Sequence, residues 1–321
     1  MTLKFYVGLG SFSLSLFSIF LNLLIFPPVF RLAFIEKKSS VYIIAFFNII
    51  SDLLQLLVTC FYLSASIMAD EYVITGERMN TLAVIFGWIF INAWYMECLV
   101  QIVMAANRFC IITLKQYHIF TFNFTMAVFA VLIAITSFSA VCTQYLFPCC
   151  VFISDKDIMS FMFENPRQEY SYSNLMLVSY DIFCTSTSTV CYISVFFSIR
   201  NSYKDAAISG QSEQNKRGGN KDVKYLLQFV FISIFYIFTW VLFELLPHIV
   251  PAEHPEWFSV VPVLVTLNCS SNSVIYLSCN REVRKSIRFS WRNSVSSRTS
   301  RVSTAVTTNG GQSSAVAAVD N

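Results

Sequence analysis

Charged residues are scarce in this sequence. Asp, Glu, Lys and Arg make up 13% of the 321 residues, about half of the roughly 25% that soluble domains carry. Apolar residues account for 55% of the chain, and Phe alone occurs 32 times. This composition excludes a disordered chain, a collagen-like fibre and a nucleic-acid-binding domain, and it argues strongly against a soluble enzyme. It predicts an integral membrane protein.

The residues that most often carry catalysis or bind metals are scarce as well. The three His lie in loops or at the ends of apolar stretches. No Gly-rich phosphate loop or Ser–His–Asp arrangement is visible, so we expect neither an enzyme nor a bound cofactor. Ten Cys are too few for a disulfide scaffold; Cys142, Cys149 and Cys150 either pair locally or remain free thiols. The lack of an internal repeat argues against a transporter built from repeated halves.

Seven stretches with almost no charge are long enough to cross the hydrocarbon core, which takes about 20 residues of helix. They are Phe5–Phe30, Val41–Ala69, Asn80–Asn107, Gln116–Ser154, Tyr170–Ile199, Tyr225–Ala252 and Trp257–Asn280. The fourth is longer than one span, and its outer end is expected near Pro148. No stretch shows strand alternation, so a barrel is excluded. The predicted fold is an all-α bundle of seven transmembrane helices.

Lys and Arg indicate the orientation of this bundle, because cytoplasmic loops are enriched in them. Residues 31–40, 108–118, 200–224 and the tail from 281 hold 18 of the 22 Lys and Arg residues. The loops on the other side hold the remaining four, together with nine acidic residues. The N-terminus is therefore expected outside the cell and the tail in the cytoplasm, which agrees with an odd number of spans.

Two carboxylates are predicted at one depth in the middle of the membrane, where ionisable groups are costly and mark candidate functional sites. At about 1.5 Å per helical residue, Asp52 and Glu97 lie about 18 and 16 Å from the cytoplasmic side. Asn22, Asn268 and Asn272 are expected near the same level. This polar layer either binds a cation, with sodium at Asp52 as one alternative, or shares a proton between the two acids, or is a hydrogen-bonded structural core.

The other two membrane acids, Asp181 and Glu244, lie about 9–10 Å from the outer surface, on spans five and six. Helix positions three, four or seven apart share a face, which brings aromatic and hydroxyl side chains to the same level. The predicted ligand-binding residues are Phe90, Trp94, Asp181, Thr185, Ser188, Trp240 and Glu244. They would line an outward-opening cavity for a small, mostly apolar molecule with one polar group. Ordinary helix packing is the alternative.

Short motifs in the spans carry a resemblance to a known family. Ser51-Asp52 stands in the middle of span two, Asn107-Arg108-Phe109 ends span three, and Asn272-Ser-Val-Ile-Tyr276 stands in span seven. In these motifs and in its seven spans the chain resembles G-protein-coupled receptors. Leu227-Gln228 in span six and the Ile275-to-Arg284 ending of span seven make it most similar to nematode serpentine chemoreceptors, with class x as the best match. The resemblance covers about residues 5–290.

The resemblance implies a chemosensory receptor that binds a small external molecule and activates a heterotrimeric G protein. It implies a multi-pass protein of the plasma membrane and, by family resemblance, of the sensory cilium. It assigns coupling to Asn107, Arg108 and Tyr276, with Arg108 as the switch residue. The chain departs from the family at Asn107, where an acid usually stands, so the usual ion pair with Arg108 is unavailable.

Two parts of the chain are distinguished by composition. Residues 1–292 form the predicted receptor domain, in which Asn280–Trp291 resembles the short amphipathic eighth helix on the inner leaflet. Residues 293–321 are rich in Ser and Thr and are expected to be a disordered cytoplasmic tail. The expected partners are the ligand, the G protein and the lipid bilayer, with no nucleic acid. The alternative is a small transporter or ion-conducting protein that uses the four acids as a proton or cation path.

Overall fold

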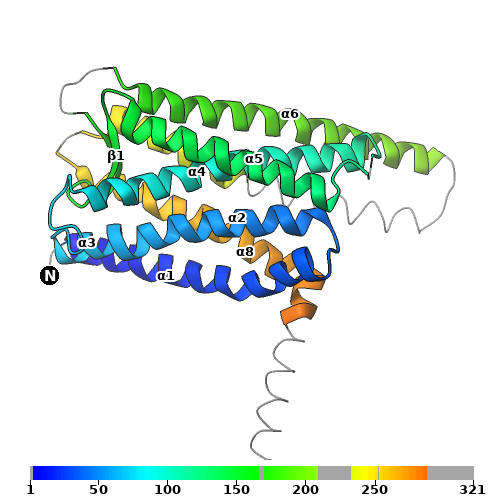
Figure 1. The fold of residues 1–321 in the computed structure, drawn as a ribbon, viewed down its shortest axis with the longest axis horizontal. Helices are drawn as coiled ribbons and strands as arrows, with labels where there is room; N and C mark the ends of the chain where they lie inside the picture. Colours follow the sequence, from blue (N-terminus) through cyan, green and yellow to red (C-terminus); the bar gives the residue numbers. More distant parts are fainter. Residues whose placement is uncertain (1–2, 117, 166–169, 209–232, 252, 288–321) are drawn as a thin grey trace, which may run out of the picture.

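The computed structural model describes residues 3–116, 118–165, 170–208, 233–251 and 253–287, without the side chains of residues 202–208. Long helices run side by side through this part of the chain (Figure 1). Six of them are long and apolar enough to cross a membrane: Leu3–Ile35, Ser40–Ala69, Thr81–Thr113, Phe122–Leu146, Tyr172–Asn201 and Pro255–Cys279. The shorter apolar helix Ser233–Ile249 supplies the remaining member of the predicted seven-helix bundle.

Most of these spans are composed of more than one helical element. The elements are α1 Leu3–Phe30 with η1 Arg31–Ile35; α2 Ser40–Leu57 with η2 Val58–Ser64 and α3 Ala65–Ala69; α4 Thr81–Arg108 with η3 Phe109–Thr113; α5 Phe122–Val141 with η4 Cys142–Leu146; α6 Tyr172–Ile208; and η5 Pro255–Ser259 with α8 Val260–Cys279. Residues 281–287 are helical, at the start of the expected eighth helix. Leu227-Gln228 and the tail 293–321 lie outside the described residues.

Polar side chains fix the starts of three spans. Ser39, Asn80 and Thr121 precede α2, α4 and α5, and each accepts a hydrogen bond from a backbone N–H of the first turn. Such caps satisfy amide groups that have no partner within the helix. The apolar stretches predicted from the sequence therefore begin where a capping residue ends a polar loop.

A β-hairpin stands between α5 and α6, where the sequence analysis expected no strand. Strand β1 Val151–Asp155 pairs antiparallel with β2 Ser160–Glu164, with Val151 opposite Glu164 and Asp155 opposite Ser160. The stretch Gln116–Ser154 thus divides near Pro148, as expected, but its last residues enter a strand. The expectation failed because two five-residue strands are too short to show a clear alternation. Just before β1, Cys149 and Cys150 form a disulfide, while Cys142 is a free thiol.

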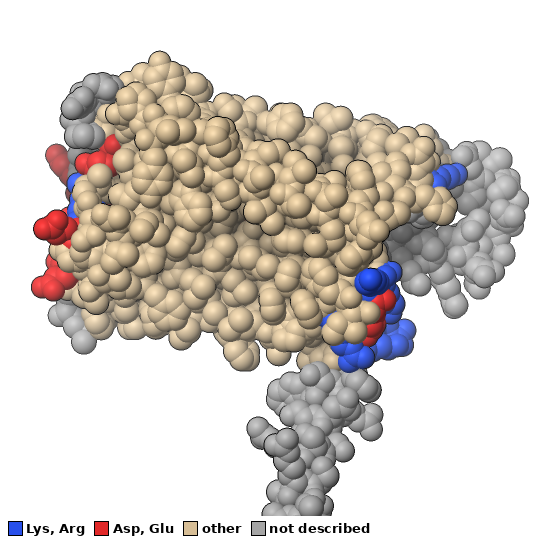
Figure 2. Space-filling view, in the orientation of Figure 1, with Lys and Arg blue, Asp and Glu red and all other residues tan. Residues whose placement is uncertain are grey.

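The side surface of the bundle is apolar, and charged side chains are buried among its helices. Large side chains such as Phe17, Phe138 and Phe183 are exposed, whereas Asp52 and Glu97 are completely buried. Soluble proteins bury such apolar side chains and expose their charged ones, so this reversed distribution fits a protein surrounded by lipid. In Figure 2 acidic side chains gather at the end of the bundle that carries the N-terminus, Lys and Arg gather at the other, and the band between them shows no charge. The charged ends agree with the orientation deduced from the loops.

Helix α4 occupies the centre of the bundle and packs against α2, α5 and α6. The apolar core on either side of it forms two clusters. One lies in the outer half and includes Phe90, Trp94 and Phe152, and the other lies in the inner half and includes Met104 and Tyr276. Side chains of α4 therefore contribute to the core in both the outer and the inner half of the bundle.

Candidate functional site

A cavity of about 340 Å³ lies in the outer half of the bundle, enclosed by α4, α6, the helix Ser233–Ile249, α8 and the hairpin. The lining is predominantly aromatic and aliphatic, and it consists of Phe90, Ile91, Trp94, Phe152, Phe161, Leu177, Asp181, Thr239, Trp240, Phe243, Val261 and Val265. Asp181 is the one ionisable residue in this lining.

The carboxylate of Asp181 is held by one of its two oxygens. Tyr236 Oη donates a hydrogen bond to Oδ1 at 2.5 Å, Trp94 Nε1 donates to the same oxygen at 3.1 Å, and Cys98 Sγ lies 3.5 Å from it. No donor in the described part of the chain contacts Oδ2. The side chain is 1% exposed and lines the cavity.

The predicted ligand-binding residues divide into three groups. Four of them, Phe90, Trp94, Asp181 and Trp240, line the cavity together. Thr185 and Ser188 lie beside a second, smaller pocket of about 210 Å³, although Trp240 Nε1 donates to Thr185 Oγ1 at 3.2 Å.

Glu244 is apart from both pockets. It is half-buried, and its Oε2 accepts a hydrogen bond from Asn174 Nδ2 at 3.2 Å. The structure therefore does not bring the two outer acids to one wall. The depth along a helix does not determine which way a side chain faces.

The hairpin supplies two aromatic rings that the sequence analysis did not assign to the site. Phe161 stacks on Phe90 with ring centroids 4.0 Å apart, and Phe152 lies 5.6 Å from Phe90. The side chain of Gln144 fixes the position of β1: its Nε2 donates to the Phe152 carbonyl at 2.9 Å, and its Oε1 accepts from the Phe152 N–H at 2.7 Å. The hairpin is thus part of the cavity wall.

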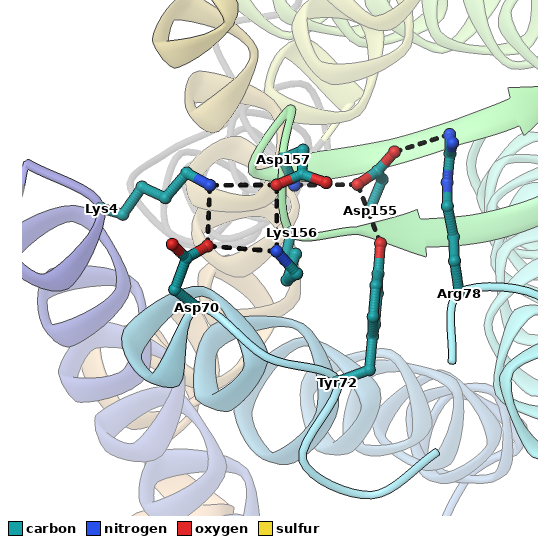
Figure 3. A network of polar contacts seen from close by, with 7 residues as sticks. All are labelled: Lys4, Asp70, Tyr72, Arg78, Asp155, Lys156 and Asp157. Atoms are coloured by element: carbon teal, nitrogen blue, oxygen red, sulfur yellow. Dashed lines mark hydrogen bonds and ion pairs between the residues drawn. The ribbon is translucent and has the colours of Figure 1, made fainter. Parts of the chain in front are cut away.

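Charged residues fasten the tip of this hairpin to the outer ends of the helices (Figure 3). Lys4 of α1 contacts Asp70 at 2.8 Å and Asp157 at 3.0 Å, and Lys156 contacts the same two acids. Hydrogen bonds from Lys4 hold the pKa of both carboxyl groups below their usual value, and Lys156 adds to the effect. Both acids are therefore charged at neutral pH, and the ion pairs persist there.

A second set of contacts reaches the hairpin from the loop between α3 and α4. Arg78 lies 2.7 Å from Asp155 and 2.5 Å from Glu164, the last residues of β1 and β2. Tyr72 Oη donates to Asp155 at 3.1 Å. Burial, and then the neighbouring Asp155 carboxylate, raise the pKa of Tyr72, so Tyr72 remains a donor at physiological pH.

The predicted polar layer is assembled in the middle of the bundle. Asp52 Oδ2 accepts from Asn272 Nδ2 at 3.2 Å, and Asn268 Nδ2 donates to Glu97 Oε1 at 2.6 Å. Asn22 connects α1 to α8, since its Nδ2 donates to the Cys269 carbonyl at 3.1 Å.

Three more residues of this layer escaped the sequence analysis. Asn48, one turn before Asp52, donates to Asp52 Oδ2 at 3.0 Å, and Gln55 Nε2 donates to Glu97 Oε2 at 2.8 Å. Cys269 supplies a thiol: ligand atoms of Asp52, Glu97 and Cys269 lie within 4.8 Å of one another. The spacing of Asn48 and Gln55 from Asp52, on the same face of α2, was the available signal.

The layer contains buried oxygen atoms that lack a hydrogen-bond donor. Asp52 Oδ1, Asn268 Oδ1 and Asn272 Oδ1 have none among the described residues. Unsatisfied buried oxygens are uncommon, and hard cations prefer carboxylate and carbonyl oxygens as ligands. The geometry can hold a small cation at Asp52 or a proton between the acids.

At the cytoplasmic end, the residues assigned to coupling lie on α4 and α8. Asn107 is buried and its Nδ2 lies 3.4 Å from Ser40 Oγ, so its amide points towards the start of α2. Arg108 is the last residue of α4 and is partly exposed. Tyr276 is buried in the inner apolar cluster. The structure thus places these three residues in the inner part of the bundle.

Comparisons with known proteins agree with this architecture. The model of the family described as serpentine type 7TM GPCR chemoreceptor Srx matches residues 12–280. Among solved structures, squid rhodopsin superposes with a TM-score of 0.69 at 14% sequence identity, over 90% of this chain and 85% of its own. At that identity the likeness shows the fold alone. A search of curated proteins gave no match.

Proposed function

The chain belongs to the Srx family of serpentine 7TM chemoreceptors, and on that basis we propose that it is a chemosensory receptor that binds a small external molecule and activates a heterotrimeric G protein. The family is one of receptors and not of enzymes. As a multi-pass membrane protein of this family, the chain acts in the plasma membrane, in the sensory cilium where such receptors meet external molecules.

The observation that carries the proposal is the outer cavity with the unpaired oxygen of Asp181. Aromatic rings surround one buried carboxylate, whose Oδ1 is fixed by Tyr236 and Trp94 while Oδ2 has no donor in the described part of the chain. A small apolar molecule with an amine or hydroxyl fills such a cavity and supplies the donor. Cation–π attraction to the rings favours an amine.

The polar layer below the cavity is the proposed switch. Asn22, Asp52, Glu97, Asn268 and Asn272 join α1, α2, α4 and α8 through buried side chains. A cation or proton taken up there changes which of these side chains pair, and it thereby shifts the balance between two packings of the helices. Sodium at Asp52 is the cation considered.

Asn107, Arg108 and Tyr276 are the proposed coupling residues at the cytoplasmic face. Because Asn107 is neutral and directed towards Ser40, it does not hold Arg108 by an ion pair. Arg108, at the cytoplasmic end of α4, is the residue that we assign to contact with the G protein. Residues 1–292 carry this function, and the tail 293–321 is the proposed disordered extension.

Nucleotide exchange on a co-expressed G protein is the direct test. Cells that express the chain are screened with fractionated small molecules, and exchange is measured in their membranes at equal surface expression, with empty-vector membranes as the control. We expect a fraction that stimulates exchange only when the chain is present. If fractions that bind the chain never stimulate exchange on any G-protein class, the proposal is wrong.

The four acids could alternatively form a path for protons or cations. Measurements on membranes containing the chain distinguish this alternative from the receptor proposal. Apolar side chains of the inner cluster, among them Ile49, Val100 and Met104, lie between the polar layer and the cytoplasm. Ligand-independent current or uptake in vesicles containing the chain would support a transporter or channel. We expect none above that of vesicles without it.

A further inference from the structure

A charged pocket at the cytoplasmic end has no part in the proposed function. It has a volume of about 550 Å³ and lies between η1, the following loop and the helical residues 281–287. Its lining consists of Arg31, Leu32, Glu36, Lys38, Glu282, Lys285 and Ser286. The visible face in Figure 2 shows Lys and Arg gathered at this end of the bundle, with acidic atoms among them.

The pocket contains charges of both signs. Arg31 pairs with Glu36 at 2.9 Å, and Lys38 pairs with Glu282 at 2.9 Å. Tyr42 Oη donates to Glu282 at 2.7 Å and so anchors the second pair to α2. Lys285 adds a third cation, which leaves one positive charge in excess over the two acids.

The neighbouring surface is suited to hydrocarbon. Ile35, immediately before Glu36, is 69% exposed, and Phe30 and Leu23 on the same span are also exposed. These side chains face the lipid, so a molecule whose polar part lies in the pocket has room for an acyl chain along α1. A soluble anion would leave this apolar surface unused.

We propose that this pocket binds the headgroup of a phosphatidylserine molecule of the inner leaflet. The phosphate and carboxylate of that headgroup match the three cations, its ammonium matches Glu36 and Glu282, and its net charge of minus one balances the excess. Phosphatidylserine is an anionic lipid of the cytoplasmic leaflet. The proposal is independent of the ligand and the G protein.

Basic residues near a membrane end are expected from topology alone, and a general attraction to anionic lipid does not require a pocket. The acids Glu36 and Glu282 distinguish a diffuse basic patch from a specific headgroup pocket. In a purely cationic patch, neutralising Glu36 strengthens binding of every anionic lipid. In the proposed pocket, it weakens the preference for a headgroup that has an ammonium.

The experiment measures lipid binding to the purified full chain by native mass spectrometry, with phosphatidylserine, phosphatidylglycerol and phosphatidylcholine titrated separately. A hydrogen bond to a charged group that is lost from a bound headgroup is worth about ten-fold or more in binding. Lys38→Gln combined with Lys285→Gln is therefore expected to weaken phosphatidylserine binding by at least about ten-fold. The matched control is Lys37→Gln, because Lys37 lies outside the pocket lining, 4.7 Å over the ring of Phe122, and it should leave binding within about two-fold.

The Glu36→Gln variant is expected to reduce the preference for phosphatidylserine over phosphatidylglycerol by about three-fold or more. An equal loss in Lys37→Gln, or tighter binding of both anionic lipids to Glu36→Gln, would overturn the proposal in favour of a diffuse basic patch. Displacement of the lipid by equimolar soluble glycerophosphoserine would overturn it in favour of a soluble phosphate ligand. Unchanged thermal unfolding of each variant shows that the bundle remains folded.

Discussion

At the scale of single residues, Asp181 is the side chain on which the ligand proposal depends most. Asp181→Asn keeps an oxygen for Tyr236 and Trp94 but presents an amide donor to the cavity in place of the acceptor Oδ2. A hydrogen bond to a charged group contributes about 1.5–3 kcal/mol, equivalent to about ten- to a hundred-fold in affinity. We expect the dose–response curve of an amine or hydroxyl ligand to shift rightward by at least about ten-fold.

Glu244→Gln is the matched control for this experiment. It makes the same change of a carboxylate to an amide one helix away, but Glu244 pairs with Asn174 outside the cavity lining. Its curve should move by less than about three-fold. If both variants shift the curve equally at preserved surface expression, ligand potency depends on the long-range electrostatic effect of the two carboxylates and not on direct contact with Asp181.

Asp52 is the residue that tests the polar layer. Asp52→Asn removes one of two buried carboxylates, and with it the charge that would attract a cation. We expect the dependence of ligand affinity on sodium and on pH to change relative to the parent protein, measured by ligand binding across a sodium series and a pH series. Identical series in variant and parent would leave the layer as a hydrogen-bonded structural core, which was the other alternative.

The level of a side chain along its helix could be predicted from the sequence, whereas the direction in which it faces could not. A rise of about 1.5 Å per residue correctly grouped Asp52 with Asn272, and Glu97 with Asn268. The same count placed Asp181 and Glu244 at one level, but only Asp181 lines the cavity. The rotation of a helix is set by its packing against neighbours, which a single sequence does not encode locally.

At the scale of elements, the contact between α4 and the hairpin is the closest one in the site. A Cβ atom added to Gly87 would lie 2.1 Å from the Phe152 carbonyl oxygen and 2.7 Å from Gln144 Nε2. Backbone atoms cannot rotate away, so Gly87→Ala must displace β1. Overpacking of this kind costs about 1–3 kcal/mol, more than the up to about 1 kcal/mol that Ala contributes to a helix.

We therefore expect Gly87→Ala to lower the thermal unfolding temperature and to weaken ligand binding, because Phe152 lines the cavity. Gly10→Ala is the control: nothing lies within 4 Å of a Cβ at Gly10 in α1, so its stability should be unchanged or slightly raised. If Gly87→Ala unfolds and binds as the parent does, the hairpin is not held against α4 in solution.

The helices could be predicted from the sequence almost in full, but the hairpin could not. Spans two and three were expected at Val41–Ala69 and Asn80–Asn107, and they lie at Ser40–Ala69 and Thr81–Thr113. The agreement is close because a long apolar stretch in lipid can satisfy all its backbone hydrogen bonds only as a helix. The hairpin depends on the side chain of Gln144 and on contacts between residues far apart in the chain, namely Arg78 with Glu164 and the stacking of Phe161 on Phe90.

At the scale of the whole molecule, α4 joins the three levels of the proposed function. Trp94 contacts Asp181 at the cavity, Glu97 contacts Asn268 in the polar layer, and Arg108 ends the helix at the cytoplasmic side. In the proposed function, ligand at one end and G protein at the other act on this one helix. Both partners would then shift one equilibrium between two packings of the bundle.

Coupling of this kind is reciprocal, which supplies the test at this scale. If the ligand raises the affinity for G protein by some factor, the G protein raises ligand affinity by the same factor, typically about 5–150-fold. We expect added G protein without nucleotide to tighten ligand binding within that range, and GTP to reverse it. Arg108→Ala should keep the affinity measured without G protein but abolish both this increase and nucleotide exchange, since it removes the cytoplasmic contact and leaves the cavity intact. A variant that loses exchange while G protein still tightens ligand binding would show that coupling reaches the cytoplasm by another residue, and Arg108 would then be a topological arginine at the membrane surface.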